Sequence, residues 1–183
     1  RLGDVFLSLL ILIFSSPVVI FCSFLIILED GFPIIYKQIR VGHHGNKFKI
    51  FKLRSMKNDS EKDGAQWSKR NDKRITRVGK FLRLSKIDEL PQLLCVLKGE
   101  MSLIGPRPER PEFEELLDKQ IPYYKLKHLI KPGLSGWAQV NYPYGASIKD
   151  SSYKLSYDLY YLKHRSVLLD LKIIFKTIKV ILN

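Results

Sequence analysis

The fold is decided in residues 5–28, which read VFLSLLILIFSSPVVIFCSFLIIL and carry no charged side chain. As an α-helix this run would be about 36 Å long, enough to enter a hydrocarbon core of roughly 30 Å. A secretory signal peptide is the competing interpretation. The run exceeds the usual apolar region of about 7 to 15 residues, and no small-residue cleavage site follows it. The segment therefore predicts a membrane-inserted helix.

Ser16 and Pro17 lie near the middle of this run. Pro17 cannot donate the hydrogen bond that would reach the Ile13 carbonyl, so we expect a kink there. The hydroxyls of Ser15 and Ser16 can satisfy the freed carbonyl, which makes a broken helix tolerable in lipid. The residues alone leave two topologies open, a kinked single span and a helix-break-helix that enters and leaves by one face. In both cases 30 of the 31 basic residues follow the run, which places the rest of the chain in the cytoplasm.

Composition divides the 183 residues into an uncharged end and a cationic body. The whole chain has a net charge of +13, whereas residues 31–183, with 30 basic and 15 acidic side chains, carry +15. A hydrophobic content of 45% excludes a disordered polycation. Two cysteines, Cys22 and Cys95, exclude a disulfide scaffold or a cysteine zinc site and favour a reducing compartment. We expect a membrane segment at residues 1–30 and, at residues 31–183, one domain large enough to be catalytic.

Hydrophobic periodicity predicts a mainly helical α+β domain. Alternating residues at 34–41 and 47–53, separated by a glycine-containing turn, are typical of a β-hairpin. Helices are expected at 76–84, around 90–97 with Gly99 ending the helix, and at 111–120, 148–164 and 167–182. Loops are expected at 57–74 and in the Pro- and Gly-rich region 131–147.

The last expected helix is basic and amphipathic. Lys172, Lys176 and Lys179 recur at helical spacing in VLLDLKIIFKTIKVIL, and apolar side chains fill the other faces. Such a helix either packs on its own domain or lies in the membrane interface. Because a membrane segment is already present, we expect an interfacial helix at about 166–183.

Residues 37–86 hold 16 basic side chains against four acidic ones, which calls for an anionic partner. A membrane surface, a nucleic acid and a phosphate-bearing small molecule or lipid are the candidates. Nucleic acid is rejected because no DNA- or RNA-binding motif is present and a bilayer segment suits that role poorly. The four histidines lack metal-ligand spacing.

An acidic pair follows this cationic block, in Ile87-Asp88-Glu89-Leu90-Pro91. Pro91 belongs in the first turn of a helix, so we expect Asp88 or a near neighbour to be the N-cap and Glu89 to lie in the first turn. Both carboxylates would then lie at the positive end of a helix dipole, where a phosphate can also bind. Helix capping alone explains most such pairs. The Gly105-Pro106-Arg107-Pro108 segment that follows favours a functional role for the acidic pair over simple helix capping. Its prolines flank Arg107 and orient one guanidinium for contact with phosphate.

The sequence resembles the bacterial sugar transferase family, the monotopic polyprenyl-phosphate phosphoglycosyl transferases, over nearly its whole length. The resemblance is carried by SSP in the apolar run, KIFKLRSM at 49–56, LSKIDELPQLLCVLKGEMSLIGPRPE at 84–109, KPGLSGWAQVN at 131–141 and YDLYYLKHRSVLLDLKIIFKTIKVIL at 157–182. It implies transfer of a sugar-1-phosphate from a UDP-sugar to undecaprenyl phosphate, releasing UMP. This reaction initiates exopolysaccharide, capsule or O-antigen type glycans at the cytoplasmic face of the bacterial inner membrane.

The resemblance also implies roles for matching residues. Asp88 would be the nucleophile that forms an aspartyl phospho-sugar, and Glu89, with Asp88, would hold Mg²⁺. Ser16 and Pro17 would form a re-entrant break. Phosphate contacts fall to Arg107 and, more weakly, to Lys52, Arg54 and Arg83, while Gln139, Asn141 and Asp158 match family motifs without a firm role.

One departure bears on the sugar and on the extent of the chain. Small family members often continue AQVN with Gly-Arg-Asn, whereas residues 141–147 read NYPYGAS. This ending resembles the catalytic C-terminal part of larger members, so we expect an excised catalytic domain and a UDP-hexose such as glucose or galactose ahead of N-acetylated sugars. A homo-oligomer is left open. The alternatives are a non-enzymatic, membrane-anchored basic protein that binds anionic lipid and a Mg²⁺-dependent phosphatase.

Overall fold

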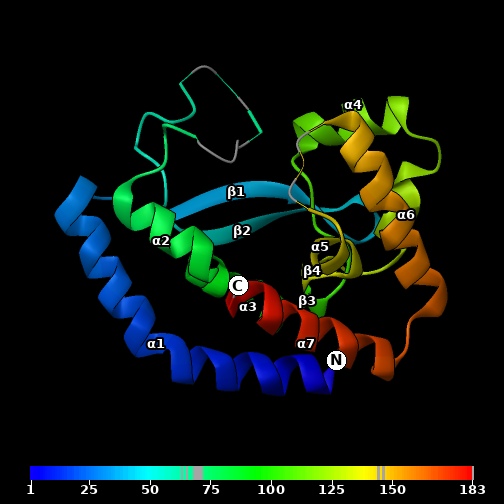
Figure 1. Ribbon diagram of the computed structural model, residues 1–183, viewed down its shortest axis with the longest axis horizontal. Coiled ribbons are helices and arrows are strands. Elements are labelled where there is room, and N and C mark those ends of the chain that lie inside the picture. The colour runs from blue at the N-terminus through cyan, green and yellow to red at the C-terminus, as the bar shows by residue number, and fades with distance from the viewer. Residues whose placement is uncertain (63, 65, 68–71, 144, 146, 183) are drawn as a thin grey trace.

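A computed structural model describes residues 1–62, 64, 66–67, 72–143, 145 and 147–182. The expected loop at 57–74 lies partly outside these residues, as do Tyr144 and Ala146 of the NYPYGAS segment. Helices and strands alternate irregularly, as a mainly helical α+β fold requires (Figure 1). The helices are α1 (Leu2–Asp30), α2 (Arg77–Ser85), α3 (Leu93–Lys98), α4 (Pro111–Gln120), α5 (Trp137–Asn141), α6 (Ile148–His164) and α7 (Val167–Leu182). The strands are β1 (Ile35–Val41), β2 (Lys47–Leu53), β3 (Ser102–Ile104) and β4 (Gly133–Ser135), and short 3-10 helices occupy His43–Gly45, Ile87–Gln92 and Tyr124–Leu129.

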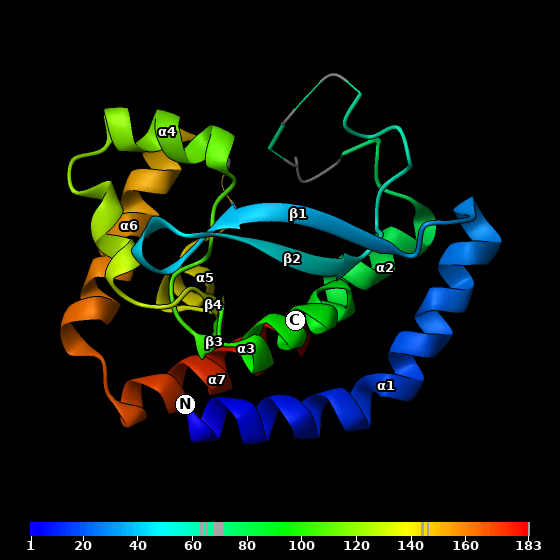
Figure 2. The same cartoon turned by 180° about the vertical axis from the view of Figure 1, so that it is seen from behind.

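Helix α1 contains the whole apolar run and bends about half-way along its length (Figures 1 and 2). The Ser16 hydroxyl donates to the Ile13 carbonyl at 2.8 Å, as expected for the acceptor that Pro17 leaves free. The helix is nevertheless continuous, so Ser16 and Pro17 produce a bend and no interruption. Within the described residues α1 is the one helix long and apolar enough to cross a membrane.

The expected hairpin is confirmed. Strands β1 and β2 pair antiparallel from Ile35 opposite Leu53 to Val41 opposite Lys47, with the 3-10 turn at their closed end. The expected helix at 76–84 is α2, whose N-cap Thr76 accepts the Gly79 amide at 2.9 Å. The 3-10 helix that carries the acidic pair packs against the hairpin and α2.

The start of the next helix differs from the expectation. Asp88 is not the N-cap; its near neighbour Lys86 holds that position, with a left-handed backbone (φ 58°) and no side-chain cap. A 3-10 helix begins at Ile87, and Glu89 lies in its first turn as expected. Lys86 ends α2 and reverses the chain, so the new turn begins before Asp88 and the Asp88 side chain points inward. The 3-10 helix contains Pro91 and leads into α3, which ends at Gly99 (φ 88°) as expected.

The expectation of a loop at 131–147 is wrong for residues 133–135 and 137–141. This region contains β4, which pairs parallel with β3, and the short helix α5. The close approach depends on glycine, because a Cβ on Gly133 would lie 2.0 Å from the Gly105 backbone nitrogen. The pairing attaches the KPGLSG segment to the loop that carries Arg107.

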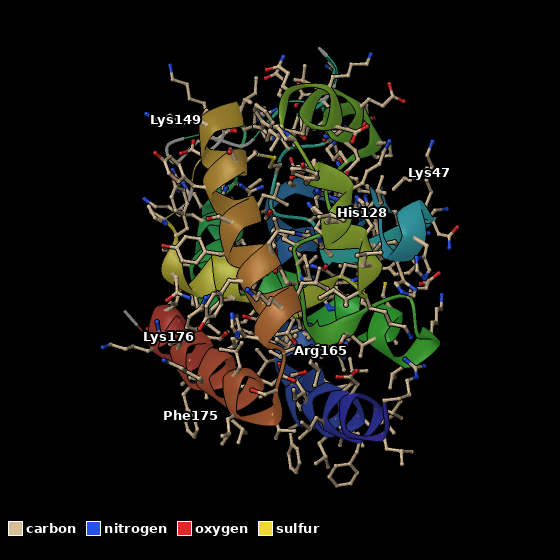
Figure 3. The ribbon with its side chains drawn as sticks, turned by 90° about the vertical axis from the view of Figure 1, so that its right-hand side faces the viewer. Lys47, His128, Lys149, Arg165, Phe175 and Lys176 are labelled. Atoms are coloured by element: carbon tan, nitrogen blue, oxygen red, sulfur yellow. The ribbon has the colours of Figure 1, made fainter. Side chains whose placement is uncertain are left out.

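Helix α1 shares a core with the body. Cys22 and Ile26 of α1 are buried against Leu53 and Leu82. Exposed apolar side chains of α1 and α7 lie along the same edge of the molecule, where Phe175 projects from α7 (Figure 3).

Candidate active site

The acidic pair lies where β2, the Ile87–Gln92 turn and the Gly105–Pro108 loop meet. Glu89 accepts from two cations: its Oε1 lies 2.7 Å from Lys52 Nζ and 2.7 Å from Arg107 Nη2, while Oε2 lies 3.4 Å from Arg107 Nη1. The structure thus brings together Asp88, Glu89, Lys52 and Arg107, which the sequence selects from three separate segments.

These cations control the ionisation of Glu89. Burial by itself would raise the pKa of the Glu89 carboxyl, but Arg107 and Lys52 outweigh it and hold that pKa well below its usual range. Glu89 in turn raises the pKa of Arg107. The three groups form a fixed arrangement of two cations around one carboxylate.

Asp88 is in a different environment from its neighbour. It is 6% exposed, and its Oδ1 is buried without a hydrogen-bond partner. Burial raises the pKa of the Asp88 carboxyl; Lys52 opposes this effect and Glu89 adds to it. An orphaned carboxylate oxygen costs free energy in the protein alone and is suited to contact a group brought by a ligand.

The donor set fits Mg²⁺ in part. Among the described residues there is no cluster of three or more acidic, His or Cys side chains that could enclose a metal. Mg²⁺ usually takes one or two carboxylates and completes its shell with phosphate oxygens and water. Asp88 Oδ1 and the weakly bonded Glu89 Oε2 are the oxygens available for that purpose.

Two of the weaker phosphate candidates, Arg54 and Arg83, donate hydrogen bonds to groups outside the acidic pair. Arg54 donates to the carbonyls of Asp30 and Gly31 at 2.9 and 2.8 Å, so it holds the end of α1. Arg83 donates from Nε to the Ser55 hydroxyl at 2.9 Å and also lowers the pKa of Asp88. Arg83 is therefore electrostatically part of the site, whereas Arg54 is engaged with the end of α1.

Gln139 and Asn141 also form hydrogen bonds with other residues of the chain. Gln139 Nε2 donates to the Leu134 carbonyl at 3.2 Å, and its buried Oε1 has no hydrogen-bond partner. Asn141 donates to the Trp137 carbonyl at 2.8 Å and accepts from Lys176 of α7. These bonds order α5 and join it to α7.

Asp158 is buried in α6, and its charge interacts with Lys127 and Lys154. Burial raises the pKa of the Asp158 carboxyl to about 7, and the two lysines offset only part of that effect. Lys127 is a buried cation that the sequence analysis did not select, and its ammonium lies 3.1 Å from the Tyr124 hydroxyl.

The pH dependence of the free energy of unfolding should report the protonation of Asp158. The unfolded pKa of an aspartate is about 3.9, so the folded state binds the Asp158 proton more tightly. The contribution of Asp158 to stability is full below about pH 4 and is lost towards pH 7, at no more than about 1.4 kcal/mol per pH unit. We expect Asp158→Asn, which resembles the protonated form, to gain stability over the parent chain across this window. Denaturant unfolding in micelles measures the difference in free energy of unfolding between Asp158→Asn and the parent chain. A difference independent of pH would contradict the raised pKa of Asp158.

Sequence reasoning missed a polar network beside the site. Arg40 of β1 donates to the Pro108 carbonyl and to Glu109, and to Gln38 on its own strand. The signal was present as the alternation of Tyr36, Gln38 and Arg40, which places three polar side chains on one face of the hairpin.

Comparison with known proteins decides the family. The model of the family described as "Bacterial sugar transferase" matches residues 1–183. The chain belongs to the bacterial sugar transferase family. The expected resemblance is thereby confirmed.

Three relatives illustrate the range of the family. An Aeromonas hydrophila protein named UDP-N-acetylgalactosamine-undecaprenyl-phosphate N-acetylgalactosaminephosphotransferase is 46% identical over 98% of this chain and 43% of its own length. A Bacillus subtilis protein, named putative undecaprenyl-phosphate N-acetylgalactosaminyl 1-phosphate transferase, is 52% identical over 67% of this chain and 68% of its length. The Escherichia coli UDP-glucose:undecaprenyl-phosphate glucose-1-phosphate transferase is 38% identical over 97% of this chain and 39% of its length. The chain thus spans less than half the length of two of these relatives.

Proposed function

We propose that the chain transfers a sugar-1-phosphate from a UDP-sugar to undecaprenyl phosphate, releases UMP and so initiates polysaccharide synthesis. The observation that carries this proposal is a pair of adjacent carboxylates that differ in their hydrogen-bond partners. Glu89 is locked by Lys52 and Arg107, and Asp88 is buried with a free oxygen. Two fixed cations beside a free carboxylate suit attack on an anionic diphosphate, where charge must be offset.

The reaction follows two displacements. An Asp88 carboxylate oxygen bonds to the phosphorus that carries the sugar, the bond from that phosphorus to the UMP oxygen breaks, and UMP leaves with the electron pair. A phosphate oxygen of undecaprenyl phosphate then bonds to the same phosphorus and Asp88 leaves as a carboxylate. The covalent intermediate lets a soluble and a lipid substrate use one site in turn.

The fixed cations and Mg²⁺ have complementary roles in this scheme. Arg107, whose side chain is 44% exposed, presents its guanidinium to the incoming diphosphate. The less exposed Lys52 offsets the negative charge of the acidic pair. Mg²⁺, held by Asp88 and Glu89, would neutralise phosphate oxygens during transfer. Arg83 lowers the pKa of Asp88 and so favours its ionised, nucleophilic form.

We propose a re-entrant path for α1. At its start, Arg1 donates to the Val96 and Leu97 carbonyls at 3.0 Å each, and Asp4 accepts from Ser102 Oγ at 3.0 Å. Its far end is attached to the same body by Glu29, which accepts the amides of residues 77 and 78. A straight span would place these two ends on opposite sides of the bilayer, so hydrogen bonds at both ends favour entry and exit by one face.

Cysteine labelling tests this topology. Gly3 has open space around it, since no atom lies within 4 Å of an added Cβ, so Gly3→Cys should fold normally. We expect an impermeant maleimide to label it only from the cytoplasmic side, as it labels the control Lys149→Cys at an exposed position of α6. The native cysteines, Cys22 and Cys95, are buried. Labelling of Gly3→Cys from the periplasmic side alone would establish a span.

The domain division follows from this topology. Residues 1–30 form the membrane helix, and residues 31–183 form the catalytic domain at the cytoplasmic face of the bacterial inner membrane. Helix α7 exposes Leu168, Phe175 and Ile178, which supports an interfacial position beside α1. The site then lies close to the surface where undecaprenyl phosphate presents its headgroup.

The names of the relatives bear on the donor. Two relatives with 46% and 52% identity are named for N-acetylgalactosamine, whereas the glucose enzyme from E. coli is 38% identical. We therefore place UDP-N-acetylgalactosamine ahead of UDP-glucose and UDP-galactose, which reverses the order expected from the sequence.

A donor panel tests the proposed function. Purified protein in micelles with Mg²⁺ and undecaprenyl phosphate is supplied with each UDP-sugar, and UMP and the lipid-linked sugar are measured. We expect equal amounts of both with one donor. Release of inorganic phosphate without a lipid product would identify a phosphatase, and no turnover with anionic-lipid binding would identify a membrane-anchored basic protein.

A further inference from the structure

The loop that carries Arg107 is fixed on both sides. Before Arg107, the Gly105 amide donates to the Ser135 carbonyl and the Gly133 amide donates to the Pro106 carbonyl, both at 2.9 Å. After it, the Val41 amide donates to the Glu109 carbonyl at 2.9 Å. Strands β4 and β1 therefore hold the two ends of a short loop, and its Arg107 side chain donates to Glu89.

Arg40 is the side chain that clamps this loop to the hairpin. Its Nη1 donates to the Pro108 carbonyl and to Glu109 Oε1, each at 3.1 Å, and its Nη2 donates to Gln38 Oε1 at 2.6 Å. The side chain is 14% exposed. One buried guanidinium thus holds the two residues that follow Arg107.

Further hydrogen bonds support Arg40 from behind. Gln38 Nε2 donates to the Tyr36 hydroxyl at 2.7 Å, and that hydroxyl donates to Glu61 Oε1 at 2.9 Å. Arg110 Nη1 also donates to Glu61 Oε1, at 2.8 Å. The network fixes the direction of the Arg40 fork. A planar guanidinium presents its donors to the Pro108 carbonyl, the Glu109 carboxylate and the Gln38 amide oxygen in one fixed geometry, which the rotatable donors of an ammonium do not provide.

We infer that Arg40 is a positioning residue for transfer: by clamping Pro108 and Glu109, it holds the Arg107 guanidinium in the direction that phosphate needs. This inference rests on the proposed function. A direct contact between Arg40 and phosphate is the other use of such a cation. It is disfavoured because both Nη groups of Arg40 already donate to Pro108, Glu109 and Gln38.

Kinetics and exchange test the inference together. A small displacement of a positioned group costs up to about 100-fold in rate, so we expect Arg40→Gln to lower kcat about 30-fold while the KM for the UDP-sugar changes less than about twofold. Arg40→Lys keeps the charge and loses the fork, and should lose about 10-fold. Lys125→Gln, which removes a surface ion pair with Asp118, is the control and should keep full activity.

A double-variant cycle separates positioning from direct contact. If Arg40 acts through Arg107, then Arg40→Gln should cost nothing further once Arg107→Gln is present. Losses that multiply would overturn the inference and indicate direct substrate contact. Glu109→Gln, which weakens the clamp and leaves Arg40 in place, should give a smaller loss in the same direction.

Hydrogen exchange needs no substrate and thus distinguishes this inference from the proposed function. In Arg40→Gln, amides of residues 102–112 and Val41 should exchange at least about 10-fold faster, with the rest of the chain unchanged. Unchanged exchange there would overturn the clamp even in an active enzyme. Faster exchange confined to this region, in a protein that releases no UMP, would support the clamp and reject the transferase.

Discussion

Asp88→Asn is expected to reduce UMP release by about 1,000-fold or more, because the amide has no anionic oxygen to bond to phosphorus. The substitution is nearly isosteric. Asp88 Oδ1 has no hydrogen-bond partner in the protein, so the variant should keep its fold. The measurement is the initial rate of UMP release with saturating donor, undecaprenyl phosphate and Mg²⁺, alongside the thermal unfolding midpoint.

A single-turnover experiment isolates the role of Asp88. With donor and no lipid acceptor, the parent chain should release about one UMP per active site and gain the mass of one sugar phosphate, as a covalent first step requires. Asp88→Asn should do neither. Asp118→Asn, at the surface ion pair with Lys125, is the matched control and should behave as the parent. UMP release by Asp88→Asn within tenfold of the parent rate would contradict Asp88 as the nucleophile.

The elements that the sequence predicts well have strong local signals. The helix 111–120 begins with proline, and the helices at 148–164 and 167–182 have their apolar residues at helical spacing; their bounds agree with α4, α6 and α7. The hairpin is also local, since its alternation and its turn lie within 20 residues. Such elements need no knowledge of distant partners.

The parts that the sequence does not predict depend on distant contacts. Strands β3 and β4 have three residues each and pair across about 30 residues, too short for a periodic signal. Arg54 has the composition of a phosphate ligand, yet it contacts the end of α1, 24 residues away in the chain. In the same way, Asn141 reaches Lys176 on α7. A residue type restricts the chemistry, whereas the partner decides the role.

Glu89→Gln is expected to lower the rate of UMP release by about 100- to 1,000-fold, because it removes the charge that orders both cations and one of two Mg²⁺ ligands. Lys52 and Arg107 would face a neutral amide, and burial would then favour the uncharged form of Lys52. We expect the Mg²⁺ concentration for half-maximal rate to rise, and chelation to abolish UMP release by the parent chain until Mg²⁺ is restored. Glu115→Gln, at an exposed position of α4, is the control. An unchanged Mg²⁺ dependence with a reduced rate would assign Glu89 to the ordering of Lys52 and Arg107 alone, because a carboxylate that holds the metal cannot lose its charge without weakening metal binding.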